Sequence, residues 1–316
     1  MKKHKISLIT GVAGTIGSNL AKYLLNKNHI VLGFDNLSLG SKNNLNKIIK
    51  NKNFKFFKCD VSSMKELKKL KFYYKIDYLW LLAANSDIKK GYLSIDNDLN
   101  NTLMTTISSL NHFSNKLEKN GKICFSSSSA VYGNLKSKLN ENNQNYNPIS
   151  NYGESKLISE LYIENFCKKL KLNYLILRFP NVVGKPFTHG IIFDLAKKLI
   201  KNKSLNVLGN GNQKKPYVHV SELVECMYYL IKKKNQHKLY LIGPRDKGIT
   251  VKQIVKILKN NFRIKKRTTY QKQVHGWPGD VPIYSYNTSR LKKEGFTFKL
   301  SSKQAIDLAI KERNFI

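Results

Sequence analysis

The sequence has few acidic residues, few cysteines and no long hydrophobic run. Asp and Glu number 20 among 316 residues, against 56 Lys and Arg. The four cysteines (Cys59, Cys124, Cys167 and Cys226) are widely separated and form no Cys-x-x-Cys pair, which argues against a disulfide scaffold and a zinc site. The longest apolar run, at 78–84, has the length of a strand and not of a membrane span. We therefore expect a soluble, reduced, cytoplasmic protein with no bound metal and no membrane partner.

The net charge of +36 is the unusual feature of the composition. Such a balance ordinarily indicates a nucleic-acid partner. However, only six of the basic residues are arginine, the preferred reader of bases and phosphates, and the lysines are spread over nearly every segment. The densest basic stretch, Lys259 to Arg267, is typical of a solvated helix end and its loop. The sequence thus predicts no specific nucleic-acid partner, only weak, salt-sensitive adhesion to polyanions.

Short β-rich runs alternate with longer helical patterns, which predicts an α/β fold of the Rossmann type, a doubly wound parallel sheet. The expected strands are 6–10, 29–35, 53–59, 78–84, 122–126 and 174–178. Helical periodicity covers 18–26, 97–119 and 152–169. From Pro180 on, Gly, Pro and Asn become frequent and the strands shorten. We therefore expect a first domain over 1–179 and a smaller C-terminal α/β lobe over 180–316, with a cleft between them.

A glycine-rich turn follows the first expected strand and opens the first helix. Gly11, Gly14 and Gly17 permit a tight turn, and the N–H groups of the helix start suit a pyrophosphate. Asp35 ends the second strand about 20 residues on, where a carboxylate accepts hydrogen bonds from an adenosine ribose. Asn36 follows without an adjacent arginine for a 2′-phosphate, which favours NAD over NADP. The alternative is an ordinary glycine-rich loop with a solvent-facing aspartate.

A tyrosine and a lysine lie four residues apart at the start of a helical stretch. At this spacing, Tyr152 and Lys156 project from one face. A free tyrosine has a pKa of about 10, and a neighbouring ammonium and a positive nicotinamide ring favour the phenolate. The serine run at 126–129 supplies a hydroxyl at the sheet edge where such folds bind ligands. This set indicates reversible alcohol–ketone chemistry, whereas a chance match would leave only a surface Tyr and Lys.

Further motifs follow in order along nearly the whole chain. They are Leu82-Ala83-Ala84, Asn100, Val131-Tyr132-Gly133, Arg178 to Gly184, Leu208 to Lys215 and Trp277-Pro278-Gly279-Asp280. With the glycine turn and the Tyr–Lys pair, they make the sequence similar to the extended short-chain dehydrogenase/reductase superfamily, in its NAD-dependent nucleotide-sugar epimerase/dehydratase branch. The resemblance implies a tightly bound NAD, a nucleotide-diphosphate sugar as substrate, and a homodimer that pairs through the helices of 97–119 and 152–169.

The motifs and the resemblance together predict contacts for both ligands. The residues expected at NAD are Gly11, Gly14, Thr15, Ile16, Gly17, Asp35, Asn36, Asp60, Val61, Leu82, Ala83, Ala84, Asn100, Ser126, Tyr152, Lys156 and Phe179. The residues expected at the substrate are Ser128, Asn181, Lys215, Tyr217, Trp277, Asp280 and Tyr284.

The residues after the catalytic hydroxyl separate the reactions of the branch. Its dehydratases carry an Asp–Glu pair there, whereas Ser128 is followed by Ser129 and Ala130. The chain thus resembles the 4-epimerases of the UDP-glucose/UDP-galactose type, with Ser127 as a competitor for the hydroxyl position. The resemblance implies that Tyr152 removes the proton from the sugar O4, that hydride passes from C4 to NAD⁺ to give a 4-keto sugar, and that hydride then returns to the opposite face.

Two departures from the family pattern concern the substrate. Lys215 and Trp277 stand where the family usually has arginines for the diphosphate; a lysine keeps the charge without the bidentate fork, and a tryptophan removes it. Tyr284 matches a position that borders the sugar C2 substituent, which favours a hexose without an N-acetyl group. The alternatives are a dehydratase, decarboxylase or reductase on the same scaffold, or a non-catalytic NAD-binding protein with a regulatory or RNA-associated role.

Overall fold

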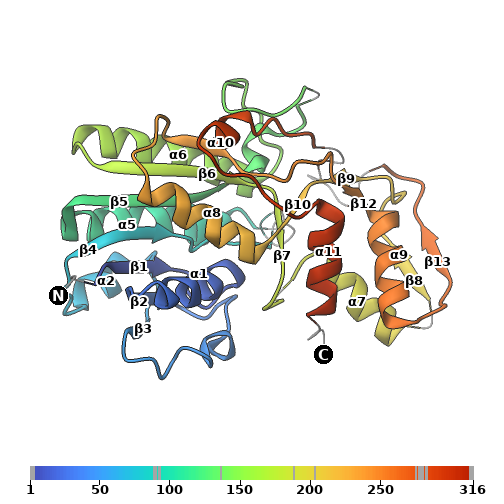
Figure 1. Cartoon of the computed structure of the whole chain (residues 1–316), viewed down its shortest axis with the longest axis horizontal. Helices are drawn as coiled ribbons and strands as arrows, with labels where there is room; N and C mark the ends of the chain where they lie inside the picture. Colours follow the sequence, from blue (N-terminus) through green and yellow to red (C-terminus); the bar gives the residue numbers. More distant parts are fainter. Residues whose placement is uncertain are drawn as a thin grey trace.

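The computed structural model describes residues 4–87, 91, 94–135, 137–187, 189–202, 204–274, 276, 281 and 284–312. Its centre is a seven-stranded parallel sheet with helices on both faces (Figure 1). The strands are β1 Ile6–Thr10, β2 Ile30–Asp35, β3 Phe54–Lys58, β4 Ile76–Leu81, β5 Leu117–Ser128, β6 Asn173–Phe179 and β11 Leu239–Leu241. Their order is β11-β6-β5-β4-β1-β2-β3, which confirms the predicted doubly wound α/β fold.

The two faces of the sheet are covered by different helices. The helices of this part are α1 Thr15–Asn26, α2 Met64–Lys69, α4 Ile95–Asp98, the π-helix η2 Leu99–Met104, α5 Thr105–Phe113, α6 Asn151–Lys169 and α8 Val220–Lys232. Short 3₁₀ helices are η1 Lys42–Leu45, η3 Ser114–Lys116 and η4 Ser129–Tyr132. α1 and α8 pack on one face, and α2, α5 and α6 on the other.

The strands are apolar on both sides because both faces of the sheet are buried. Consecutive residues of a strand point to opposite faces, so Leu79 joins the core under α2, α5 and α6, while Trp80 joins the core under α1 and α8. Ile123 and Cys124 divide in the same way one strand further on. This explains why stretches such as 30–34 of β2 and 78–81 of β4 appear in the sequence as continuous apolar runs.

Two predicted boundaries were wrong, for local reasons. β4 ends at Leu81 and not at residue 84, because the N–H groups of Leu82 and Ala83 donate to the Thr10 hydroxyl and leave the ladder. The helix expected over 97–119 ends at Phe113, and β5 begins already at Leu117. The other expected strands and helices lie within a few residues of their predicted positions.

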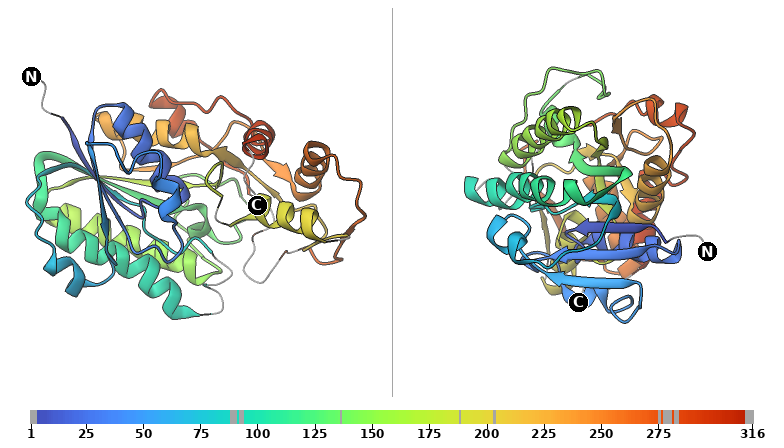
Figure 2. Two further views of the ribbon diagram at one scale, coloured as in Figure 1. Left: turned by 90° about the horizontal axis from the view of Figure 1, so that it is seen from below. Right: turned by 90° about the vertical axis from the view of Figure 1, so that its left-hand side faces the viewer.

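A smaller lobe lies beyond the carboxyl ends of the strands (Figures 1 and 2). Its elements are β7 Asn181–Val183, α7 Ile191–Lys201, β8 Leu205–Val207, β9 Lys214–Lys215, β10 Tyr217–His219, β12 Ile249–Thr250, α9 Val251–Phe262, β13 Thr268–Tyr270 and α11 Ser302–Lys311. α10 Ser289–Lys293 packs instead against β11 of the main sheet. α7, α9 and α11 enclose a core of their own. α8 and β11 also follow residue 179, yet they pack on and extend the main sheet, so the chain returns to the first part of the molecule.

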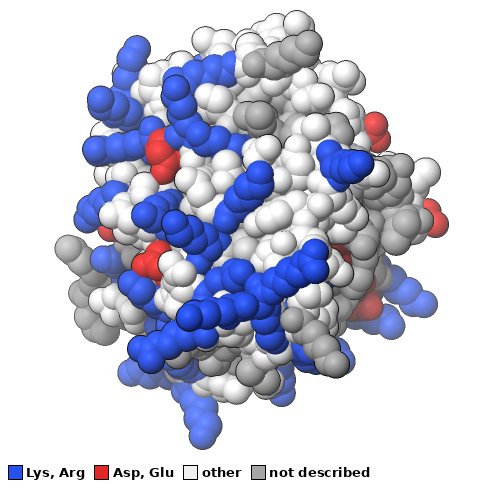
Figure 3. All heavy atoms as spheres, turned by 90° about the vertical axis from the view of Figure 1, so that its right-hand side faces the viewer, with Lys and Arg blue, Asp and Glu red and all other residues white. Residues whose placement is uncertain are grey.

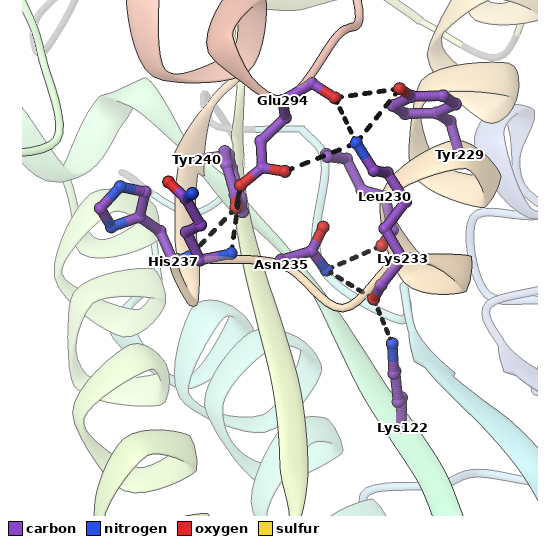
Figure 4. A network of polar contacts seen from close by, with 9 residues as sticks. Lys122, Tyr229, Leu230, Lys233, Asn235, His237, Tyr240 and Glu294 are labelled. Atoms are coloured by element: carbon purple, nitrogen blue, oxygen red, sulfur yellow. Dashed lines mark hydrogen bonds and ion pairs between the residues drawn. The ribbon is translucent and has the colours of Figure 1, made fainter.

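A network around Glu294 fastens the C-terminal segment to that sheet (Figure 4). Its carboxylate accepts hydrogen bonds from the Tyr240 hydroxyl of β11 at 2.5 Å and from the backbone N–H of Gln236 at 3.2 Å. Its carbonyl oxygen accepts from the Tyr229 hydroxyl of α8 and from the Lys233 ammonium. Glu294 thus joins α10, β11 and the end of α8 through its carboxylate and its carbonyl oxygen.

None of the helices in the described part of the chain has the length and hydropathy that a bilayer crossing requires.

Candidate active site

The glycine turn between β1 and α1 has no space for a side chain at Gly11 or Gly17. Gly11 has a φ of 72°, and a Cβ there would lie 2.9 Å from the Ala83 Cα. A Cβ at Gly17 would lie 2.1 Å from the Gly11 carbonyl oxygen. No side chain caps the start of α1 at Gly14, so its first N–H groups face the turn. The turn can therefore hold a phosphate against the helix N-terminus, next to the chain that follows β4.

Asp35 is fixed directly beneath this turn. Its carboxylate, 8% exposed, accepts hydrogen bonds of 2.8 Å from the N–H groups of Ala13 and Leu37. Burial raises the pKa of Asp35, and the two hydrogen bonds oppose that shift. The Asn36 side chain donates to Asp60 at 3.3 Å, which brings together the ends of β2 and β3. The residues predicted for the adenosine end of NAD therefore lie together.

The order of the strands places the turn at a switch point of the sheet. From β1 the chain winds to β2 and β3 on one side, and from β4 to β5 and β6 on the other. Loops that leave β1 and β4 therefore diverge, and such a crevice is where open α/β sheets bind ligands. Leu82 and Ala83, which we predict to contact NAD, lie beside Gly11 at this crevice.

The three serines at the end of β5 have different partners. The Ser126 hydroxyl donates to the Leu81 carbonyl oxygen at 3.1 Å. Ser127 is buried, and its hydroxyl donates to Glu160 of α6. Ser128 is half-buried, its hydroxyl accepts a 3.1 Å hydrogen bond from the Ala130 N–H, and it acts to lower the pKa of the neighbouring Tyr152. The alternation of a strand thus directs Ser127 away from Tyr152 and Ser128 toward it.

Tyr152 and Lys156 lie in the first turns of α6, which begins at the N-cap Ser150. Lys156 is 2% exposed, its ammonium donates to the Ser126 carbonyl oxygen at 2.6 Å, and it lies 5.7 Å from the centre of the Tyr152 ring. Burial lowers the pKa of Lys156 to about 7, with Glu160 and Asp98 opposing. Burial also raises the pKa of Tyr152 to about 12, and hydrogen bonding with Ser128 opposes that shift.

The direction of the tyrosine shift differs from the sequence-based expectation. The expectation was that the lysine and a nicotinamide ring together lower the pKa of Tyr152, whereas loss of solvent is the largest influence of the chain itself and raises it. Lys156 approaches the face of the ring, and burial weakens its own positive charge. Burial of both side chains therefore opposes formation of the phenolate.

Three charged residues near this site were missed at the level of the sequence. Arg178 at the end of β6 forms a buried ion pair with Glu160 at 2.6 Å and stacks between two tyrosine rings, each 4.7 Å away. Asp98 is fully buried and accepts a 3.0 Å hydrogen bond from the Asn85 side chain. Its charge raises the pKa of both Tyr152 and Lys156. The sequence signal that could have indicated such a residue is a charged side chain within an apolar run, as Arg178 is in its strand.

The residues predicted for the substrate lie on several short elements of the smaller lobe. Asn181 of β7 is exposed, and its register partner on the parallel strand β10 is the buried Tyr217. Lys215 is half-buried on β9, and the N–H of the buried Tyr284 donates to the Lys214 carbonyl oxygen at 3.2 Å. Trp277 and Asp280 lie outside the described residues.

Two of the residues predicted at the cofactor differ in their exposure to solvent. Phe179 ends β6 and is buried, whereas Asn100 is exposed on the π-helix η2. Among the residues that the structure describes, no three His, Cys, Asp or Glu side chains gather as a metal site would require.

A glycine turn over a fixed aspartate, with Ser128, Tyr152 and Lys156 at the carboxyl edge of the sheet, defines a site of the short-chain dehydrogenase/reductase class. Comparison with known proteins agrees. The chain belongs to the NAD dependent epimerase/dehydratase family, which matches residues 7–243. The NAD dependence of this family confirms NAD as the cofactor predicted from the sequence. The glycine turn fits NAD, because three glycines leave space for a dinucleotide and the uncapped N–H groups of α1 would face its pyrophosphate.

The chain is similar to family members with different reactions. It is 25% identical over 296 residues to UDP-glucuronate 4-epimerase of Thermodesulfobacterium geofontis, covering 90% of this chain and 88% of the relative. It is 30% identical over 256 residues to dTDP-D-glucose 4,6-dehydratase of Dictyostelium discoideum, covering 75% of this chain and 57% of the relative. Among solved structures, a UDP-galactose 4-epimerase superposes with a TM-score of 0.83 at 25% identity, covering 97% of this chain and 98% of that one.

Proposed function

We propose that the protein epimerises a nucleotide-diphosphate sugar at C4. The observation that carries this proposal is the pairing of Tyr152 with Ser128 beside the buried Lys156, with no carboxylate in the two positions after Ser128. An enzyme that only oxidises and re-reduces an alcohol needs one group for the hydroxyl proton. Elimination of water would need a further acid and base.

In this proposal Tyr152 takes the proton from the sugar O4 and later returns it. Ser128 shares the hydrogen bond to that oxygen and thereby orients it. Lys156 stabilises the phenolate, and its contact with the Ser126 carbonyl holds the ammonium in place. NAD, when bound, supplies the exchange of hydride with C4. Gly11, Gly14 and Gly17, with Asp35, would hold it in the crevice.

A dehydratase is the second candidate, because one relative at 30% identity carries that name. Ser129 and Ala130 occupy the positions where an acid–base pair would stand, and neither can ionise. The carboxylates near Lys156, Asp98 and Glu160, are both buried and engaged in hydrogen bonds. These contacts favour epimerisation over loss of water.

We further propose a UDP-hexose without an N-acetyl group as substrate. Tyr284 is buried and packs with Val131 and Tyr132, the residues that follow the serine run. A tyrosine in this place leaves little space for an acetamide beside the reacting sugar. Lys215 would supply a positive charge for the diphosphate.

The direct test is product analysis after incubation of the protein with UDP-glucose, UDP-N-acetylglucosamine and dTDP-glucose. We expect UDP-galactose from UDP-glucose, measured by proton NMR, with no accumulation of NADH. Formation of a 4-keto-6-deoxy sugar from dTDP-glucose would replace epimerase by dehydratase. Preference for the acetylated substrate would overturn the role of Tyr284 while leaving the C4 chemistry intact.

A further inference from the structure

The outer end of the smaller lobe has a strongly one-sided charge. Between Asp246 and Asp280 the sequence contains nine basic residues and no acidic one. This stretch includes α9 and β13, which lie at the end of the molecule farthest from α2 (Figure 1). Figure 3 faces this end and shows many Lys and Arg with few Asp and Glu. The charge here is therefore locally uncompensated, and not only an average over the chain.

A groove of about 340 Å³ runs between α9 and β13 on this face. One wall is a row of lysines, Lys252, Lys256 and Lys259, on successive turns of α9. At 1.5 Å per residue, the three lysines are spaced roughly 6 Å and roughly 4.5 Å apart along the helix axis. Among the described residues, none of the three forms an ion pair, and the Lys259 ammonium donates only to the neutral Lys266 carbonyl and Thr268 hydroxyl.

The other wall carries an exposed aromatic ring. Tyr270 ends β13, lines the groove and has the Lys252 ammonium 5.6 Å from its ring centre. Both side chains pack over Gly211, where a Cβ would lie 2.7 Å from each of them. The ring is thus held in place while 36% of the tyrosine remains exposed. The apolar side of α9 faces the core, since Ile254, Val255 and Leu258 are buried, so this helix offers no apolar face to a bilayer.

We propose that this groove binds single-stranded nucleic acid without sequence preference. The lysine row would follow successive phosphates, and Tyr270 would stack on a base. Basic grooves with aromatic platforms bind single strands in this way, and every base has a face for stacking. The site lies outside the NAD crevice and does not depend on the proposed epimerase reaction.

The test is fluorescence anisotropy of a labelled 20-nucleotide oligouridylate titrated with the full-length protein at several salt concentrations. Replacing Lys252, Lys256 and Lys259 by Gln should weaken binding at least tenfold, and the salt slope should fall by about 2, since each phosphate contact on a single strand contributes about 0.7. The matched control replaces Lys65, Lys68 and Lys69 by Gln on α2, which removes the same charge from exposed positions elsewhere. This control should bind as the wild type does.

Stacking is tested without any change of charge. Tyr270→Ala should weaken binding about tenfold, as loss of one base–aromatic stack does. Tyr73→Ala, at a tyrosine that is 86% exposed elsewhere, should have no effect. Equal losses for both lysine variants would overturn the proposal in favour of net charge alone. Stronger binding to phosphatidylserine vesicles than to the oligonucleotide, lost in the α9 variant, would overturn it in favour of a membrane surface. An unchanged melting temperature of the α9 variant would verify its fold.

Discussion

Burial sets the charge of the two titrating side chains at the centre of the site. Lys156 and Tyr152 both lie where water is excluded, so each is shifted toward its neutral form. Binding of a positive nicotinamide ring would favour the phenolate, which couples the charge of Tyr152 to the cofactor.

We expect Tyr152→Phe to abolish turnover while the fold and NAD binding remain, because only the acid–base oxygen is lost. Ser128→Ala should lower kcat at least tenfold. Ser127→Ala should act mainly on stability, since Ser127 faces Glu160. Steady-state kinetics and thermal melts of the three variants measure both effects. If Ser127→Ala lost as much kcat as Ser128→Ala at unchanged stability, the assignment of the hydroxyl would be reversed.

A second prediction concerns stability and pH. Lys156 has a pKa of about 7 in the folded chain, below its ordinary value of 10.5. Between these values the unfolded chain holds a proton that the folded chain has released, so the free energy of unfolding should rise with pH across this window. Lys156→Met should therefore stabilise the protein most at pH 7 and below, and the gain should vanish toward pH 10.5.

Urea unfolding at pH 6, 8 and 9.5 would measure this difference, with Lys169→Met on the same helix as the exposed control. A gain in the free energy of unfolding that is constant with pH would show that burial does not lower the pKa of Lys156.

At the scale of elements, the turn between β1 and α1 combines two separate requirements. Gly17 is needed because the helix approaches the Gly11 carbonyl too closely for a Cβ. Gly14 has space for one, since its Cβ would meet the Gly11 carbonyl only at 3.4 Å, an ordinary contact. Gly17 is thus required for packing within the turn, whereas Gly14 is required for the close approach of the ligand.

Gly17→Ala should therefore lower both the melting temperature and the affinity for NAD. Gly14→Ala should leave the melting temperature nearly unchanged and weaken NAD binding alone. Differential scanning fluorimetry with and without NAD separates the two effects. Equal melting temperatures for both variants would contradict the packing role of Gly17.

At the scale of the whole molecule, α6 presents an apolar strip that the single chain does not cover. Leu161 and Tyr162 are each 53% exposed, and Ile158 is 40% exposed. Ile95 and Leu99, on the neighbouring α4 and η2, are also exposed. An exposed apolar group of this kind is typical of an association surface. It supports our proposal of a homodimer that pairs through the helices of this face.

We expect light scattering to give twice the 36.4 kDa chain mass at micromolar concentration. Leu161→Asp should shift the protein to the monomer, because a charge would be buried in the interface. Leu308→Asp, at a partly exposed leucine on α11, should not. A wild-type protein that remains monomeric would refute the dimer.

The sequence determined the fold class and most strands, because a parallel sheet buried on both faces favours continuous apolar runs such as 30–34 and 78–81. It also indicated the glycine turn and the Tyr152–Lys156 pair, whose chemistry depends on residue type and local spacing. Only the tertiary structure separated Ser127 from Ser128, since adjacent strand residues differ by the face to which they point.

Tertiary structure also decided where charge is buried. Glu160, Arg178 and Asp98 come from three segments, and their roles depend on contacts that no local pattern encodes. The pKa of Tyr152 rises because the surrounding elements exclude water, which a Tyr-x-x-x-Lys spacing cannot show. In the same way, the lysines of α9 look like a general bias in the sequence. Their alignment beside Tyr270 arises only when β13 packs along the helix.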